Sequence, residues 1–64
     1  MANTVKFELY RDVGKQYRWR LFAGNGEIVA TSEAYTQLSS ARRSAERVRE
    51  IASTAIITEH DNLK

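Results

Sequence analysis

The residues of this chain that could carry chemistry are arginines interleaved with aromatic side chains. In the stretch YRWRLFAGNGEIVATSEAY, residues 17–35, Arg18 and Arg20 alternate with aromatic residues. Guanidinium groups bind phosphates and aromatic rings stack on bases, a combination that sheet-based single-strand binders use. One face of a sheet could therefore bind nucleic acid or another partner through Tyr10, Arg18, Arg20 and Phe22.

A second basic cluster follows on a predicted helix and comprises Arg42, Arg43, Arg47 and Arg49. Glutamates lie among both sets of arginines, and long amphipathic side chains also cover an exposed sheet face and keep it soluble. The net charge is only +2, so the pI of about 9.3 is weak evidence for nucleic acid. A structural role for both clusters is favoured over binding.

Signatures of catalysis and of metal binding are poor. The chain has no cysteine, and its one histidine, His60, lies in a polar tail, so neither a disulfide framework nor a Cys/His metal site can be built. The segment Gly24-Asn25-Gly26 predicts a turn, because a phosphate loop needs more glycines before a helix. We predict no enzyme, no cofactor and no small-molecule substrate. The serines without a nucleophile motif, interpreted as caps or helix-surface residues, are Ser39, Ser40, Ser44 and Ser53.

The length of 64 residues allows one domain, with a core from about residue 5 to 59 and a frayed tail over about 60–64. So small a domain buries only about 60% of the surface that its unfolded chain exposes. Without disulfides or a metal, self-association is the remaining way to stabilise it. The lack of cysteine, signal peptide and membrane span predicts a cytoplasmic protein with no membrane partner.

Two strands and a hairpin can be read from the first half of the chain. Alternation over Val5–Tyr10 predicts a half-buried strand, Arg11–Gln16 a turn, and residues from Tyr17 to about Ala23 a second strand. Asn25-Gly26 predicts a type I′ turn, which needs positive φ at both residues.

That turn would set the register of the hairpin. Counting from a Gly24–Glu27 pair places Leu21 opposite Ala30 and predicts a cross-strand ion pair between Arg18 and Glu33. It also separates a core face from an outer face. The predicted core face holds Tyr17, Trp19, Leu21, Ala23, Ile28 and Ala30, with Phe7 and Leu9 of the first strand.

Apolar residues recur at helical spacing from about Leu38 to Ser53 and predict a helix, with either Thr36 or Ser39 as its N-cap. Its expected surface ion pairs are Arg42–Glu46 and Arg47–Glu50. The following segment, Thr54–Glu59, is β-branched and predicts a last strand that requires burial on both faces. The order is then β-β-β-α-β.

Three segments together resemble the YegP-like family, small bacterial and archaeal domains of unknown function. They are FELYRD at Phe7–Asp12, the Tyr17–Tyr35 stretch, and the Ser/Ala/Arg-rich helix, with Tyr17 standing where the family often has Trp. The resemblance implies an α+β fold, an antiparallel sheet with one helix packed on one face. It also implies that two units, as tandem repeats or as a homodimer, exchange their C-terminal strands in one continuous sheet.

This chain has one such unit, so the resemblance implies a strand-swapped homodimer. The expected function is that of a non-catalytic homodimeric binding or interaction module whose partner the sequence does not identify. The alternative is an accessory nucleic-acid-binding protein that uses the Arg/aromatic sheet face.

Overall fold

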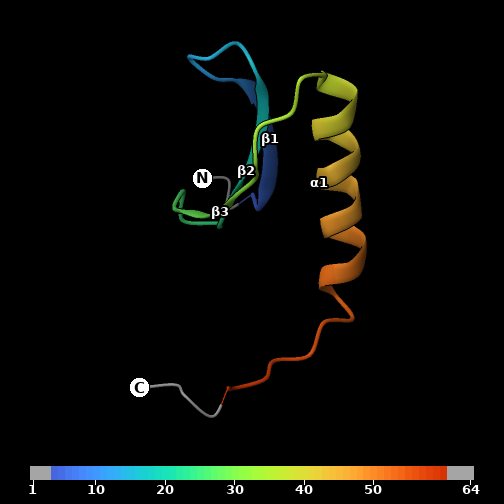
Figure 1. Ribbon diagram of the computed structural model, residues 1–64. Helices are drawn as coiled ribbons and strands as arrows, with labels where there is room; N and C mark the ends of the chain where they lie inside the picture. Colours follow the sequence, from blue (N-terminus) through green and yellow to red (C-terminus); the bar gives the residue numbers. More distant parts are fainter. Residues whose placement is uncertain (1–3, 61–64) are drawn as a thin grey trace.

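The computed structural model describes residues 4–60 and has an α+β architecture. Its elements are β1 (Lys6–Arg11), β2 (Tyr17–Phe22), β3 (Ile28–Thr31) and α1 (Leu38–Ala52). The strands form one antiparallel sheet in the order β1-β2-β3, and α1 packs on one face of it against β1 and β2 (Figure 1). The prediction of an antiparallel sheet with one helix on one face is confirmed.

The turn between β1 and β2 is organised by Asp12. Strand β1 continues one residue further than predicted, to Arg11. The backbone N–H of Asp12 then donates to the Gln16 carbonyl at 2.8 Å, and the Lys15 N–H donates to the Asp12 carbonyl at 3.0 Å. Lys15 adopts a φ of 64°, in the left-handed region that non-glycine residues seldom occupy.

The turn between β2 and β3 is a hairpin turn, but the predicted type I′ geometry is wrong. Gly26 has a φ of 90°, whereas Asn25 is outside the left-handed region. The loop spans three residues, 24–26: the Gly26 N–H donates to the Ala23 carbonyl at 2.9 Å, and the Ala23 N–H donates to the Glu27 carbonyl at 2.8 Å. In such a loop the glycine alone takes the left-handed conformation, so Asn25 avoids that steric cost.

A bulge in β3 restores the register that the sequence predicts. Phe22 pairs with Ile28, and Leu21 pairs with Ala30, so Val29 is an extra residue in β3. The Leu21–Ala30 pair is therefore correct, although the residues nearer the turn are displaced by one. Ile28 shares the face of Phe22 and is 51% exposed, so its predicted place in the core is wrong.

Helix α1 ends one residue earlier than predicted, and Gln37 occupies its N-cap position without a side-chain capping bond. Neither Thr36 nor Ser39, the two predicted caps, fills this role. Gln37 itself has an extended backbone, with φ −127° and ψ 141°. Its carbonyl accepts the first backbone bonds of the helix, from the N–H groups of Ser40 at 3.1 Å and Ala41 at 3.3 Å.

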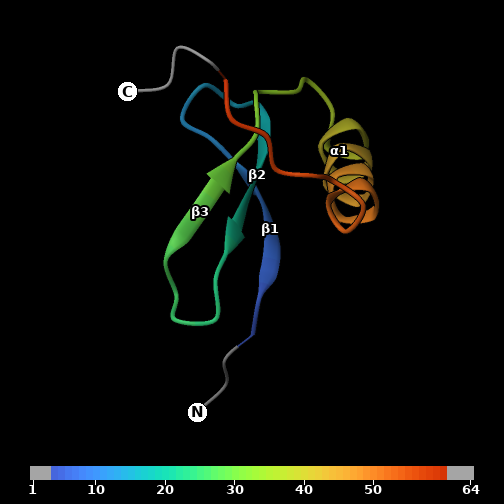
Figure 2. The ribbon, with the colours of Figure 1, turned by 90° about the horizontal axis from the view of Figure 1, so that it is seen from below.

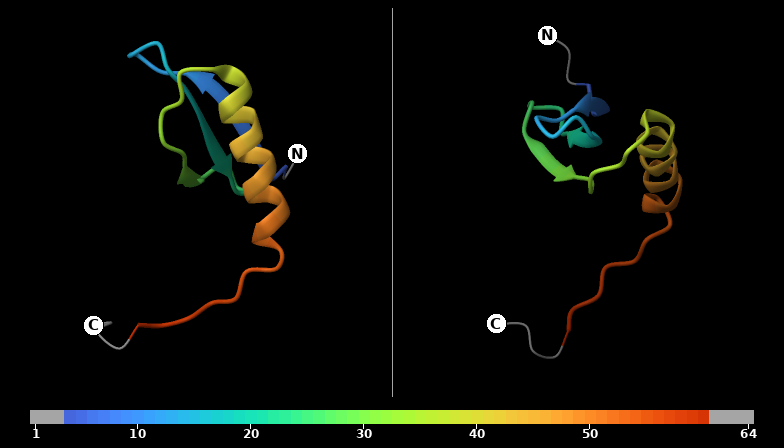
Figure 3. Two further views of the ribbon diagram at one scale, coloured as in Figure 1. Left: turned by 45° about the vertical axis from the view of Figure 1, so that its right-hand side comes forward. Right: turned by 45° about the horizontal axis from the view of Figure 1, so that its top comes forward.

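The core is small and centres on Trp19 of the middle strand. Trp19 is 5% exposed, and it faces the two buried alanines of α1, Ala41 at 0% and Ala45 at 7%. Phe7 of β1 meets the Trp19 ring edge-on, with centroids 5.0 Å apart and an interplanar angle of 78°. Figure 3 shows α1 running along one face of the sheet, and small alanine side chains on its inner side allow such close packing. The prediction that Trp19 lies on the core face is confirmed.

The predicted fourth strand, Thr54–Glu59, is not formed in the single chain. Residues 55–60 have no regular secondary structure and lead away from the end of α1 and from the sheet in Figure 1; seen from below, they cross in front of the strands (Figure 2). Ile56 is 83% exposed and Ile57 97% exposed. A strand exists only where a neighbouring strand satisfies its backbone groups, and this segment has no strand neighbour within residues 4–60. Most of the predicted frayed tail lies outside the described residues.

Candidate binding site

The outer face of the sheet brings Tyr10, Arg20 and Phe22 together, as the alternation predicts. The Arg20 guanidinium lies over the Tyr10 ring, 4.2 Å from its centroid, and 5.7 Å from the centroid of Phe22. Its Nε donates to Glu8 Oε1 at 2.8 Å. Lys6 Nζ lies 5.5 Å from the Phe22 centroid on the same face. The cationic groups thus cover the rings onto which a base would have to stack.

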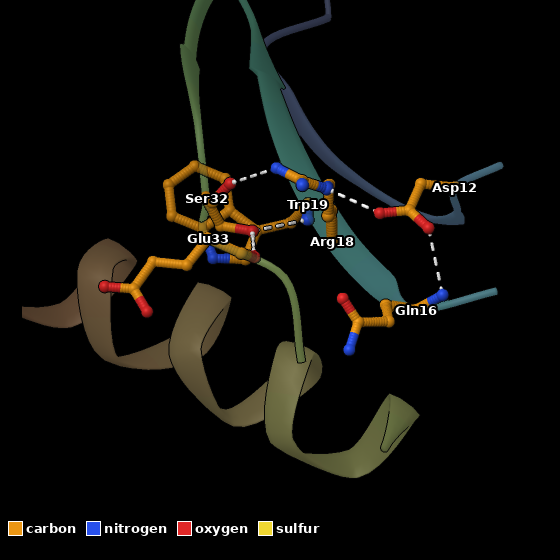
Figure 4. A network of polar contacts seen from close by, with 6 residues as sticks. All are labelled: Asp12, Gln16, Arg18, Trp19, Ser32 and Glu33. Atoms are coloured by element: carbon orange, nitrogen blue, oxygen red, sulfur yellow. Dashed lines mark hydrogen bonds and ion pairs between the residues drawn. The ribbon is translucent and has the colours of Figure 1, made fainter. Parts of the chain in front are cut away.

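Arg18, the other arginine of this face, is held by the β1–β2 turn. Its Nε donates to Asp12 Oδ2 at 2.7 Å, and another guanidinium nitrogen donates to the Ser32 carbonyl at 3.3 Å (Figure 4). The other carboxylate oxygen of Asp12 accepts the backbone N–H of Gln16 at 2.9 Å. The hydrogen bond from Arg18, followed by that from Gln16, lowers the pKa of Asp12. The same bond with Asp12 raises the pKa of Arg18.

The predicted ion pair between Arg18 and Glu33 is absent within residues 4–60, where Arg18 pairs with Asp12 instead. The chain leaves the regular ladder after β3, and the hydroxyl of Ser32, not its carbonyl, accepts the backbone N–H of Trp19 at 2.9 Å. The same Ser32 hydroxyl donates to the Glu33 carbonyl at 2.7 Å (Figure 4). The Asp12 pair could not be found from strand register, because Asp12 lies in the turn and outside both strands.

Three of the four arginines of α1, Arg43, Arg47 and Arg49, line one hollow together with Glu46 and Glu50, and each of them also borders a second hollow. Arg42 and Arg49 line a hollow of about 140 Å³ beside β1, together with apolar side chains of that strand. Arg43 and Arg47 line a larger hollow on the side of the β3–α1 connection. The predicted helix pairs Arg42–Glu46 and Arg47–Glu50 are not among the ion pairs of the described residues.

A hydrogen-bond network that the sequence reasoning missed joins the sheet to α1 and to the β3–α1 connection. Trp19 Nε1 donates to Ser44 Oγ at 2.9 Å, and the Tyr35 hydroxyl donates to the same oxygen at 3.0 Å. The backbones of Tyr17 and Tyr35 exchange two hydrogen bonds of 2.7 Å, which fixes the position of Tyr35. The interpretation of Ser44 as a cap or helix-surface residue is therefore wrong. The available indication that Ser44 faces the sheet was its position directly before Ala45, a helix residue that is buried in the structure.

The other polar residues considered from the sequence lie apart from this network. The Ser53 hydroxyl donates to the Glu50 carbonyl at 3.4 Å at the end of α1, and Asn25 Oδ1 accepts the Glu27 N–H at 3.1 Å in the hairpin turn. His60 is exposed. Over residues 4–60, no group of three or more histidine or acidic side chains is placed to hold a metal ion. In the same range, no helix has the length and apolar character needed to cross a membrane.

Comparison with known proteins gives consistent matches. The sequence profile described as "Domain of unknown function (DUF1508)" matches residues 12–59. The UPF0339 protein of Treponema denticola is 43% identical over 54 residues, which cover 84% of this chain and 93% of that protein. The UPF0339 protein YegP of Escherichia coli is 46% identical over 43 residues, which cover 67% of this chain but only 39% of YegP.

A solved structure agrees with the fold. The solution NMR structure of a protein from Haloferax volcanii is 36% identical, with a TM-score of 0.78, and the match covers 91% of this chain and 98% of that one. The resemblance to YegP-like proteins is confirmed by these matches. The chain belongs to the DUF1508 (UPF0339, YegP-like) family of domains of unknown function.

Proposed function

We propose that the protein is a non-catalytic binding or interaction module that acts as a homodimer with exchanged C-terminal segments. The observation that carries the proposal is the exposure of Ile56 and Ile57, 83% and 97%, in a segment that leaves its own fold. Adjacent residues of a strand point to opposite faces, so burying both isoleucines requires a strand that is covered on its two sides. A second copy of the chain could provide that cover symmetrically.

The rest of the fold supports this assignment. The sheet has three strands, so β1 and β3 each present an edge with unpaired backbone groups. The β1 edge also borders the hollow of about 140 Å³ between Phe7, Leu9 and α1, which offers an apolar floor to an added strand. The buried core of the single chain is limited to one large side chain and two alanines. Association would add to that core without disulfides or metal.

The nucleic-acid alternative receives less support from the sheet face. Arg18 and Arg20 each have a carboxylate partner, Asp12 and Glu8 respectively. A phosphate would have to displace these partners, and a base would have to displace Arg20 from the Tyr10 ring. These contacts favour a structural role for the outer face.

Light scattering over a dilution series tests the proposal. We expect a dimer mass that persists on dilution for the wild type. We expect Ile57→Asp to lower that mass or the stability, because a charge would enter the buried strand. The matched control is Val13→Asp, the same kind of change at a turn residue that is 105% exposed; it should leave the dimer intact. A wild-type monomer, or equal effects of the two variants, would contradict the proposal.

A further inference from the structure

A hollow of about 410 Å³ lies between α1 and the β3–α1 connection. Its lining residues are Tyr35, Ser40, Arg43, Ser44 and Arg47, and we call it the Arg43/Arg47 hollow. The hollow is shallow and open to solvent, and its volume lies within the range of about 300–1,000 Å³ that small-molecule sites span. Polar groups line it from two segments of the chain, the helix and the connection.

The charged side chains that line this hollow, Arg43 and Arg47, are both positive and make none of the ion pairs of the described residues. Arg43 and Arg47 are four residues apart on α1, so their side chains are neighbours on one face of the helix. In residues 4–60, the ion pairs join other arginines, Arg18 and Arg20, to carboxylates. Like charges at this spacing destabilise a helix, and an anion bound between the two guanidinium groups would remove that repulsion.

Within the Tyr35–Ser44 pair of this hollow, one hydroxyl hydrogen is left without an acceptor among the described residues. The indole of Trp19 can only donate, and it donates to Ser44 Oγ at 2.9 Å. Ser44 and Tyr35 then share a single bond of 3.0 Å, for which only one of the two hydroxyl hydrogens is used. The other hydroxyl hydrogen has no acceptor among the described residues. It lies on a group that lines the hollow, beside the arginines.

We propose that the Arg43/Arg47 hollow binds the phosphoryl group of a small phosphate monoester. Two guanidinium groups and a spare hydroxyl donor line the same hollow, and a phosphate presents several acceptor oxygens in a tetrahedral arrangement. A carboxylate presents two oxygens in one plane and satisfies fewer of these donors. The volume beyond the phosphoryl group would hold the organic part of the ligand.

Two acidic residues compete for the same arginines. Glu46 and Glu50 line an adjoining hollow together with Arg43 and Arg47, on the other side of these side chains. They provide an intramolecular alternative to a bound anion, so the affinity for phosphate should rise when either is neutralised. The site uses groups of a single chain and does not depend on the exchange of C-terminal segments, so mass measurements and ligand binding test separate claims.

The chain contains a natural reporter for this site. Trp19 is the only tryptophan, and its Nε1–H is bonded to Ser44, which lines the hollow. Its indole N–H signal can be followed by NMR while inorganic phosphate or phenyl phosphate is added at constant ionic strength. We expect a saturable shift with a dissociation constant on the order of 1 mM for inorganic phosphate, and tighter binding of phenyl phosphate. Chloride and acetate, added as their sodium salts, serve as control anions.

Substitutions locate the binding. Arg43→Gln or Arg47→Gln should weaken phosphate binding by at least about fivefold, since each removes a charged donor. Arg42→Gln is the matched control, because Arg42 lies on the other side of α1 beside Phe7; it should change binding by less than about twofold. Glu46→Gln should tighten phosphate binding, because it removes a carboxylate that competes for the arginines.

Three results would overturn the inference. The first is a Trp19 signal that does not saturate with phosphate or phenyl phosphate. The second is an equal response to acetate, which would exclude the phosphoryl class. The third is an equal loss of binding in Arg42→Gln and Arg43→Gln, which would indicate attraction to the charge of the helix as a whole. Retained dispersion of the amide spectrum confirms that each variant is folded.

Discussion

Trp19 Nε1 donates a hydrogen bond of 2.9 Å to Ser44 Oγ, and this bond joins the centre of the sheet to the middle of α1. The two residues are 25 positions apart in the sequence. The same oxygen accepts the hydroxyl of Tyr35, so one serine organises the contact among the sheet, the helix and their connection. Polar and apolar contacts therefore meet at one point of a small core.

Ser44→Ala should destabilise the protein by about 1–3 kcal/mol, because it removes the acceptor of two partly buried donors, Trp19 Nε1–H and the Tyr35 hydroxyl. Urea unfolding followed by circular dichroism measures the change. Ser39→Ala, at an exposed position in the first turn of α1, is the control and should stay within about 0.5 kcal/mol of the wild type. All variants are compared at one protein concentration, since dimerisation would contribute to stability. Equal losses of stability in Ser44→Ala and Ser39→Ala would show that the two hydrogen bonds to Ser44 do not stabilise the protein.

Gly26→Ala should destabilise the hairpin by about 1–2 kcal/mol, since an alanine at positive φ places its Cβ too close to the backbone. Gly26 has a φ of 90°, and no atom beyond its own residue and its two chain neighbours lies within 4 Å of an added Cβ, so the cost would come from the local backbone conformation and not from crowding by other parts of the fold. Gly14→Ala is the matched control. Its Cβ would meet Asp12 Oδ1 at 3.4 Å, an ordinary contact, and φ is not positive there. Thermal unfolding of both variants distinguishes the two sites, and an equally small loss in both would contradict the turn geometry.

The ion pair of Asp12 predicts a loss of stability in acid. The hydrogen bond from Arg18 lowers the pKa of Asp12 in the folded state, whereas the unfolded chain has the ordinary value of about 3.9. The folded state therefore releases this proton more readily, and its stabilising contribution is complete above the unfolded pKa. That contribution declines as the pH falls from there through the folded pKa.

Unfolding measured in urea between neutral pH and the acid range tests this expectation. The wild type should lose stability as the pH falls below about 4. Asp12→Asn should be less stable at neutral pH and should show a shallower decline in acid, because the titrating group is gone. A variant whose decline parallels that of the wild type would show that other carboxylates are responsible.

Much of the fold follows from local patterns. The alternation in Lys6–Arg11 and Tyr17–Phe22 and the helical spacing of Leu38–Ala52 predict the elements that form, to within about a residue at each end. The type I′ prediction at Asn25-Gly26 is wrong because the dipeptide also fits a three-residue loop in which Gly26 alone has positive φ. The bulge in β3 corrected its effect on register, and no local pattern shows a bulge in advance.

The last segment, Thr54–Glu59, shows what local patterns do not predict. Thr54–Glu59 has the composition of a strand, but pairing depends on reaching a sheet edge, and among the described residues this segment pairs with neither edge of its own sheet. Composition therefore predicted what this segment could become, without specifying its partner.

The candidate sites also depend partly on local sequence patterns and partly on tertiary contacts. Tyr10, Arg18, Arg20 and Phe22 share a face because side chains alternate along a strand, which is a property of the chain alone. The ion pairs of the two arginines, the bond from Trp19 to Ser44, and the approach of Tyr35 to Arg43 and Arg47 link residues on different elements. The Arg20–Glu8 pair follows from the β1–β2 register, and the Arg18–Asp12 pair depends on the turn between those strands. The contacts of Trp19 and Tyr35 with α1 arise only when α1 packs on the sheet, because packing sets the distances between side chains that are far apart in sequence.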